Sequence, residues 1–167
     1  MRSSIFFPSL SLKAVHGLLN RKSYLSISGP ISRFPGATAM LRSLRCLSSV
    51  SDECSISAVS HTRYSDFTRQ MISRLEIQEQ ILDGSTIQIR DFDRHEPVAE
   101  MWCEILAEEM QLSTLRIQCN AYLGASGAGL PAHCDPHAVV VVQCYGSKSW
   151  RLCKNNSRNL PSGSSHH

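Results

Sequence analysis

The first fifty residues of this 167-residue sequence contain no aspartate or glutamate, and all 14 acidic residues lie from Asp52 onward. The same fifty residues hold seven lysines and arginines and eleven serines. The other 117 residues carry 10 basic and 14 acidic residues, a net charge of −4. A mildly acidic domain lacks the positive surface that nucleic-acid binding requires, so direct nucleic-acid binding is not expected.

An Arg-rich, Ser-rich and acid-poor leader is typical of an organellar transit peptide. We therefore interpret residues 1–50 as a disordered, transit peptide-like segment that directs the chain to the mitochondrion, with the plastid second. A disordered tail, or an upstream extension before a later start at Met40, is the alternative.

Two further absences limit the class of protein. No apolar stretch reaches the roughly 18 residues that a membrane helix needs, so no membrane association is expected. The seven cysteines form no C-x-x-C pair, so neither a zinc knuckle nor a redox dithiol is indicated. A zinc site built from Cys134, Cys144 and Cys153 would lack the usual close ligand pairs.

Helical spacing begins at Tyr64 and continues through Phe67, Met71, Leu75 and Leu82, with Asp83-Gly84 as a stop signal. We predict an amphipathic helix there, followed by a short strand over 86–90, where polar and apolar residues alternate. A second helix is predicted from Pro97 to about Met110, because proline suits the first helical turn. Its expected buried residues are Val98, Trp102, Ile105 and Leu106.

Three strands are predicted between residues 115 and 152. Residues 115–123 alternate between apolar and polar, residues 138–144 (AVVVVQC) form an apolar run, and residues 147–152 (SKSWRL) follow a turn. A Gly- and Pro-containing loop, GASGAGLPA, separates the first strand from the second. This density of strands indicates a tightly wound antiparallel sheet.

His133 and Asp135 are two positions apart at the start of the apolar run. Side chains two apart on a strand point to the same face, so an imidazole and a carboxylate converge there. Two histidines and one carboxylate bind non-haem Fe(II) on one face and leave the other positions open for substrate and O₂. On its own, an H-x-D sequence is more often an ordinary surface turn.

The longer sequence NAYLGASGAGLPAHCDPHAVVVVQCYGSKSW resembles the core of JmjC-type cupin oxygenases, most closely the ribosomal oxygenase branch of histidyl hydroxylases and lysine demethylases. The resemblance covers about 38 residues, from Leu115 to Leu152. It implies an α+β protein with a partial double-stranded β-helix (cupin or jelly-roll) core preceded by two helices. The implied co-factors are Fe(II) and 2-oxoglutarate, and the implied partner is a protein substrate such as a ribosomal protein or histone.

The resemblance also implies roles for individual residues. His133 and Asp135 would bind the iron, and Lys148, fifteen positions after His133, would pair with the distal carboxylate of 2-oxoglutarate. A buried dicarboxylate needs such a cation, because an unpaired buried charge is costly. Tyr122 and Asn120 would lean toward the co-substrate, although an ordinary core role for Tyr122 is equally open. Trp150 is interpreted as a packing residue.

Two departures from the family limit these expectations. The loop before His133 is one residue shorter than the family pattern, and the second iron-binding histidine of the family would fall on a later strand, whereas this sequence ends 34 residues after His133. His137, next to Pro136, is not expected to replace it. We therefore expect a truncated form that lacks the C-terminal barrel strands and has little or no activity. A non-catalytic cupin remnant that binds a partner through an open sheet edge is the alternative.

The predicted organisation has five parts. These are residues 1–50, transit peptide-like and disordered; 51–60, a linker; 61–113, a helical lead-in; 114–153, the partial JmjC/cupin core; and 154–167, a disordered tail. The leader indicates the mitochondrion, whereas the family resemblance indicates the nucleus or nucleolus.

Overall fold

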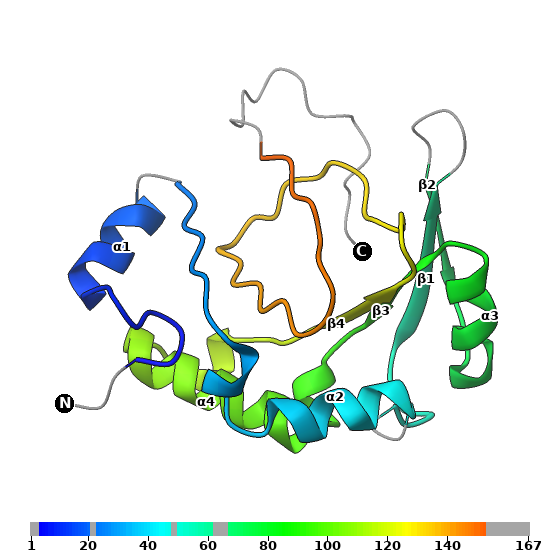
Figure 1. The fold of residues 1–167 in the computed structure, drawn as a ribbon, viewed down its shortest axis with the longest axis horizontal. Coiled ribbons are helices and arrows are strands. Elements are labelled where there is room, and N and C mark those ends of the chain that lie inside the picture. The colour runs from blue at the N-terminus through cyan, green and yellow to red at the C-terminus, as the bar shows by residue number, and fades with distance from the viewer. Residues whose placement is uncertain (1–3, 21–22, 48–49, 62–66, 153–167) are drawn as a thin grey trace.

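The computed structural model describes residues 4–20, 23–47, 50–61 and 67–152 (Figure 1). The helices are α1 (Leu12–Asn20), α2 (Ala37–Arg45), α3 (Ile77–Leu82) and α4 (Pro97–Met110), and the strands are β1 (Ile56–His61), β2 (Phe67–Met71), β3 (Thr86–Ile89) and β4 (Ala121–Gly124). Short 3₁₀ turns lie at Ile31–Arg33, Arg74–Glu76, Phe92–Arg94 and Thr114–Arg116. The mixture of helices with antiparallel strands agrees with the predicted α+β class.

The four strands form one antiparallel sheet in the order β2-β1-β3-β4. All four residues of β3 are buried, and Ile87 and Ile89 are fully enclosed. In the register of the sheet, Gln88 of β3 is paired with Ser57 of β1 on one side and Tyr122 of β4 on the other. Because β4 pairs with β3 alone in the described residues, it forms one edge of the sheet and leads into the chain that carries the H-x-D sequence.

Helix α4 confirms the prediction from the sequence. Pro97 occupies the first turn, and the Glu96 carboxylate accepts a hydrogen bond from the Val98 backbone N–H at 3.2 Å. Trp102 is buried, and Val98, Ile105 and Leu106 pack partly buried against the core. The strand predicted over 86–90 is also confirmed, as β3.

The predicted helix from Tyr64 is wrong over most of its length. Tyr64 lies outside the described residues, Phe67–Met71 pairs with β1 as strand β2, and the helix begins only at Ile77. Leu75 and Leu82 are 90% and 83% exposed, so the regular apolar spacing does not form a buried face. Pairing with a neighbouring strand here overrides the local helical pattern.

The N-terminal segment, expected to be disordered, is folded where it is described. Helix α2 buries Ala37, Met40 and Leu44, and the Phe6 and Phe34 rings meet edge to face with centroids 5.2 Å apart. Figure 1 shows α2 running beside α4 below the sheet. The reason is apolar burial, since these side chains share one core cluster with Trp102.

Gly36, which begins α2, explains how α2 and α4 approach so closely. Its φ is +75°, and a Cβ atom there would lie 2.9 Å from a methyl group of Val98. Any side chain at this position would therefore meet both backbone strain and a steric clash with α4.

Three other parts of the predicted organisation differ from the structure. The expected linker over 51–60 contains Ile56, where the central strand β1 begins, and the expected helical lead-in contains β2 and β3. Of the three strands predicted between residues 115 and 152, the structure has β4 alone, and the apolar run 138–144 and residues 147–152 form neither helix nor strand. The described residues thus form a single sheet rather than a double-stranded β-helix. The predicted disordered tail, 154–167, lies outside the described residues.

Candidate metal and co-substrate site

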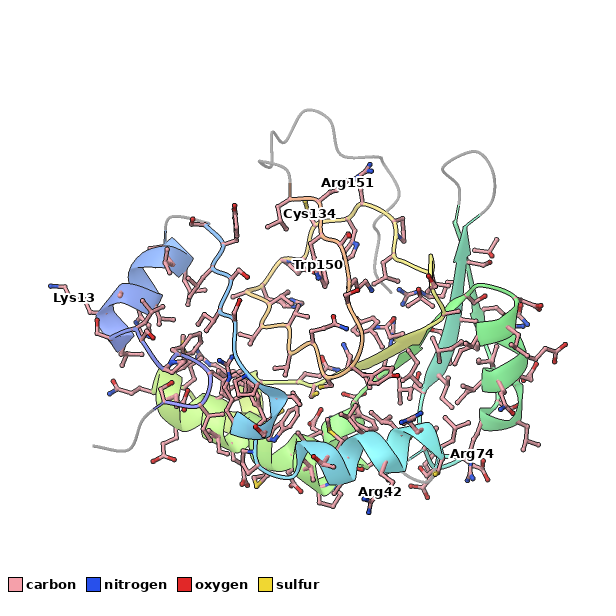
Figure 2. All side chains as sticks on the ribbon, in the orientation of Figure 1. Lys13, Arg42, Arg74, Cys134, Trp150 and Arg151 are labelled. Carbon is pink, nitrogen blue, oxygen red and sulfur yellow. The ribbon has the colours of Figure 1, made fainter. Side chains whose placement is uncertain are left out.

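The chain that follows β4 forms a broad loop, drawn yellow to orange in Figure 1. Residues 125–152 have neither helix nor strand in the structure. The loop is attached to the sheet near its start, where the Thr86 hydroxyl of β3 donates a hydrogen bond to the Gly129 carbonyl at 3.0 Å. Figure 2 labels Cys134 and Trp150 on this loop. The loop therefore begins from a fixed point on the sheet, four residues before His133.

His133 and Asp135 face each other within this loop. His133 Nε2 lies 3.6 Å from Asp135 Oδ2, and the two side chains are 45% and 36% exposed. Two ligand atoms at right angles, each about 2.1 Å from a metal, are about 3.0 Å apart. The observed separation is close to that value, so a small closing movement brings both atoms into the range for one shared ion.

A hydrogen bond to the backbone fixes how the imidazole presents its nitrogens. His133 Nδ1 lies 2.8 Å from the Pro131 carbonyl oxygen. A carbonyl oxygen can accept only, so Nδ1 donates, and in the neutral ring Nε2 carries the lone pair. That lone pair then faces a carboxylate oxygen, and either a proton on Nε2 or a metal ion bound by both atoms would stabilise this arrangement. Metal-binding histidines are held in this way by a partner on the second ring nitrogen.

Tyr122 lies among polar residues on β4, at the edge of the sheet. Gln88 Nε2 donates a hydrogen bond to the Tyr122 hydroxyl at 3.1 Å. Partial burial raises the pKa of Tyr122 above its ordinary value of 10.0, and the negative charge of Asp135 adds to the rise, whereas a hydrogen bond with Asn120 and the charges of two arginines oppose it. The negative charge of Asp135 is thus one of the smaller influences on the pKa of Tyr122, after burial.

Asn120 also holds the start of β4 in place. Its side-chain oxygen accepts a hydrogen bond from the Asp91 backbone N–H at 3.1 Å. The Asp91 carboxylate in turn accepts one from Gln118 Nε2 at 2.6 Å. Asp91 has a φ of +50°, so these bonds stabilise an uncommon backbone conformation for a residue other than glycine. Asn120 is thus a structural anchor in addition to being a neighbour of Tyr122.

Lys148 is not brought into contact with the other predicted site residues. Its ammonium nitrogen lies 5.5 Å from the centre of the Trp150 ring, a cation–π geometry. Among the residues that the structure describes, no ion pair involves Lys148. The structure therefore brings His133 and Asp135 together, places Tyr122 and Asn120 at the edge strand β4, and places Lys148 on the returning part of the loop without an ion pair among the described residues.

Two of the residues expected to bind iron, His133 and Asp135, lie close together, and the described residues bring no third such side chain beside them. Across the described ranges, no three His, Cys, Asp or Glu side chains come together as a metal site. The residues present thus fit one face of a metal ion only in part. Likewise, no helix within the described ranges has the length and apolar character to cross a membrane.

Reasoning from the sequence missed two contributors to this region. The Pro131 carbonyl orients the imidazole, and Gln88 holds the Tyr122 hydroxyl while its own Oε1 is buried without a hydrogen-bond partner. The alternation of polar and apolar residues in 86–90 predicted that Gln88 lies on a strand. Its neighbour on the adjacent strand depends on the register of the sheet. No sequence signal gave the contact itself.

A known protein and a protein family resemble parts of this chain, and the family match contains this site. The chain is 28% identical over 94 residues to a protein named as uncharacterized, YxbC of Bacillus subtilis (strain 168); the match covers 56% of this chain and 28% of YxbC. The chain therefore spans little more than a quarter of that relative. No solved structure matches. The JmjC domain model matches residues 84–167, half of the chain, which includes β3, α4, β4 and the H-x-D loop, and the protein belongs to the JmjC domain family.

Proposed function

We propose that this chain carries the iron- and 2-oxoglutarate-binding part of a protein oxygenase of the ribosomal oxygenase branch, acting on a histidyl side chain or a methylated lysine. JmjC domains generally depend on Fe(II) and 2-oxoglutarate. The observation that carries the proposal is the His133–Asp135 pair, with Nε2 and Oδ2 3.6 Å apart and Nδ1 bonded to the Pro131 carbonyl.

His133 and Asp135 would supply two protein ligands to the iron. When bound, iron with 2-oxoglutarate and O₂ would supply the oxidising power for hydroxylation. The two residues would hold the ion at a solvent-accessible position, and the Pro131 carbonyl would keep the donor nitrogen of the imidazole turned away from it. The chain's own contribution is therefore binding and orientation.

Lys148 would bind the distal carboxylate of 2-oxoglutarate. Its ammonium group has no acidic partner among the described residues and is half-buried beside Trp150. A cation in such a position is stabilised by an incoming carboxylate, because pairing the two charges through charge-assisted hydrogen bonds offsets the cost of desolvating them. Tyr122, kept protonated by its raised pKa, would donate its hydroxyl hydrogen to the same co-substrate, and Asn120 would hold Tyr122 in place.

We propose that the described part of the chain, with two candidate protein ligands, binds iron weakly and has little or no turnover. The support is that the described residues supply no third ligand near the pair. A metal ion held by few protein ligands loses the affinity and fixed geometry that a complete facial set provides. The proposed substrates are a ribosomal protein or a histone.

The test is metal binding by the whole 167-residue chain under anaerobic conditions. Fe(II), with Mn(II) as an oxygen-stable probe, is titrated with and without 2-oxoglutarate, and binding is followed by calorimetry. We expect weak binding that is lost in His133→Ala and Asp135→Ala and kept in the control His137→Ala. Equal binding by the wild type and His133→Ala contradicts the site, and rapid succinate formation contradicts the proposed low turnover.

We propose a mitochondrial location, with the nucleus or nucleolus as the alternative from the family. The support is the leader of residues 1–50, with seven basic and no acidic residues. A fluorescent protein fused after residue 55 should enter mitochondria, and the same fusion with Arg2, Lys13, Arg21 and Lys22 changed to glutamine should not. A nuclear signal from both fusions contradicts the proposal.

A non-catalytic binding module is the second candidate function. The observation that favours it is the exposed apolar run beyond β4, where Val139, Val140 and Val141 are 56%, 47% and 53% exposed. Exposed apolar surface next to an open sheet edge is typical of a partner-binding surface. Absence of metal binding together with partner binding that is lost in Val140→Asp would favour this candidate.

A further inference from the structure

A groove with a volume of about 290 Å³ lies between helices α2 and α3 and the edge strand β4 (Figure 1). Leu44 and Ile77 line it as buried residues, 8% and 1% exposed. Further aliphatic side chains line it as half-buried residues, namely Leu41, Ile81 and Leu123. The groove is therefore mainly aliphatic, and its walls come from three elements that are far apart in the sequence.

The groove lies on the other face of the sheet from Tyr122. Leu123 follows Tyr122 on β4, and successive side chains of a strand point to opposite faces. Leu123 is paired with Ile87, which is fully buried in the core, whereas Tyr122 is paired with Gln88. A ligand in the groove would thus leave the proposed iron site unoccupied, and the two sites can be tested separately.

One cation stands at the rim of the groove. Arg45, in the last turn of α2, is exposed, and its guanidinium carbon lies 5.5 Å from the centre of the Tyr145 ring. This cation–π contact connects α2 with the loop that follows β4, and both residues line the groove. The lining contains no acidic residue, and no ion pair involves Arg45 in the part of the chain that the structure describes. The rim therefore carries a positive charge that a ligand can pair.

An aliphatic groove with one cation at its rim matches a small amphipathic anion. An alkyl chain is favoured in the groove because binding removes apolar surface of both partners from water. A carboxylate at the end of that chain would accept hydrogen bonds from the guanidinium of Arg45, whose planar donors fit a carboxylate. The volume is close to the lower limit of about 300 Å³ for small-molecule sites, which favours a short chain over a long one.

We propose that this groove binds a free medium-chain fatty acid, with its alkyl chain against Leu41, Ile81 and Leu123 and its carboxylate at Arg45. Binding is non-covalent and requires neither iron nor 2-oxoglutarate, so it stands apart from the proposed oxygenase function. Helix α2 belongs to the basic first fifty residues, and β4 belongs to the JmjC-matched region. A ligand between them would stabilise the packing of one against the other, because it binds only the folded state.

The test titrates octanoate into the full 167-residue chain and follows amide NMR spectra of the isotope-labelled protein. We expect saturable shifts in residues 41–47 and 77–81 and no saturable shift in residues 133–137. Octanol, which has the same alkyl chain without the charge, should bind several-fold more weakly. The absence of saturable shifts in the groove, or equal binding of octanol and octanoate, would overturn the proposal.

Variants at the rim and wall provide the controls. Arg45→Gln should weaken octanoate binding about 2- to 5-fold, the range for an exposed ion pair, and should reduce the preference over octanol. The matched control is Arg42→Gln, an exposed arginine of the same helix that lies outside the groove and is labelled in Figure 2; it should bind as the wild type does. Equal weakening in both variants would show a general charge effect and contradict the site.

Leu41→Trp tests the groove itself by filling it. Leu41 is half-buried and lies outside the core cluster, so the larger side chain can enter the groove without displacing core residues. Octanoate binding should be lost while circular dichroism shows a folded protein, and unchanged binding would overturn the proposal. Sedimentation velocity gives the remaining outcome: a dimer that Leu41→Trp makes monomeric and that does not bind octanoate would mean that a second copy of the chain occupies the groove instead.

Discussion

Trp102 Nε1 donates a hydrogen bond to the Pro35 carbonyl oxygen at 2.8 Å, joining residues 67 positions apart in the sequence. The Trp102 ring also lies against Phe34, with centroids 5.1 Å apart. Through these contacts, α4 of the JmjC-matched region and the segment before α2 form one core. Phe34 and helix α2, within the basic first fifty residues, are therefore packed against the domain.

Replacing Trp102 with phenylalanine should reduce the free energy of unfolding by about 1–2 kcal/mol, because the hydrogen bond and part of the buried ring are lost. Urea denaturation followed by circular dichroism measures the change. The matched control is Trp150→Phe, since Trp150 is 54% exposed and should change stability by less than about 0.5 kcal/mol. Equal effects of the two substitutions would contradict the packing described.

The N-terminus is held by Glu109, near the end of α4. Its carboxylate accepts hydrogen bonds from the Ser4 hydroxyl at 2.7 Å and from the Phe6 N–H at 3.1 Å, and also from the Ile5 N–H. Glu109→Gln weakens these bonds by removing the charge, so chymotrypsin should cut near Phe6 several-fold faster. Glu108→Gln, exposed on the same helix, is the control and should be cut at the wild-type rate.

Local sequence patterns predicted the helix and the strand that depend mainly on residues close together in the sequence. Helix α4 has proline in its first turn, and β3 alternates in hydropathy, so both were predictable from sequence. Helix α2 was missed because charge composition dominated the interpretation of residues 1–50, although Ala37, Met40 and Leu44 have helical spacing and become buried. Strand β2 was missed because its structure depends on pairing with β1, which no local pattern reports.

The candidate site was likewise predictable from the sequence only in part. The H-x-D spacing predicted that His133 and Asp135 would converge from one strand; their atoms lie 3.6 Å apart, but both residues are exposed in a loop that has no strand. The hydrogen bond from His133 to the Pro131 carbonyl was not predictable, because backbone atoms carry no sequence signal. The position of Lys148 depends on the path of the whole loop, and spacing alone does not fix that path.

The raised pKa of Tyr122 gives a test of the site that does not require activity. The folded protein favours the neutral phenol, so the unfolded chain ionises first as the pH rises through 10.0. The free energy of unfolding therefore does not depend on Tyr122 below that pH, and it decreases as the pH rises above it. The ultraviolet absorbance of phenolate, compared between wild type and Tyr122→Phe, should show a step above pH 10.0.

A charge at Asp135 contributes to that rise, so Asp135→Asn should move the Tyr122 step toward lower pH. Tyr145→Phe is the matched control, because it removes a different phenol, one that does not contact Gln88. The absorbance step of Tyr122 should then stay at the same pH. An unchanged step in Asp135→Asn would mean that the carboxylate and the phenol do not share one region.

Lys148 provides a test that separates co-substrate binding from metal binding. If its ammonium pairs with the distal carboxylate of 2-oxoglutarate, Lys148→Met removes a charged hydrogen bond of about 1.5–3 kcal/mol, which weakens 2-oxoglutarate binding roughly 10- to 150-fold. Mn(II) affinity without 2-oxoglutarate should be unchanged, because the metal contacts would come from His133 and Asp135. Calorimetry with each ligand alone and in combination measures both affinities.

Arg151→Met is the matched control for Lys148→Met, since it removes a nearby positive charge from the same part of the loop (Figure 2). A general loss of positive charge would weaken 2-oxoglutarate binding in both variants to a similar extent. A specific ion pair would weaken it in Lys148→Met alone, and Lys148→Arg would retain part of the affinity because the charge remains. Equal weakening in the methionine variants would show that the ammonium acts through the overall field and not through direct contact with the co-substrate.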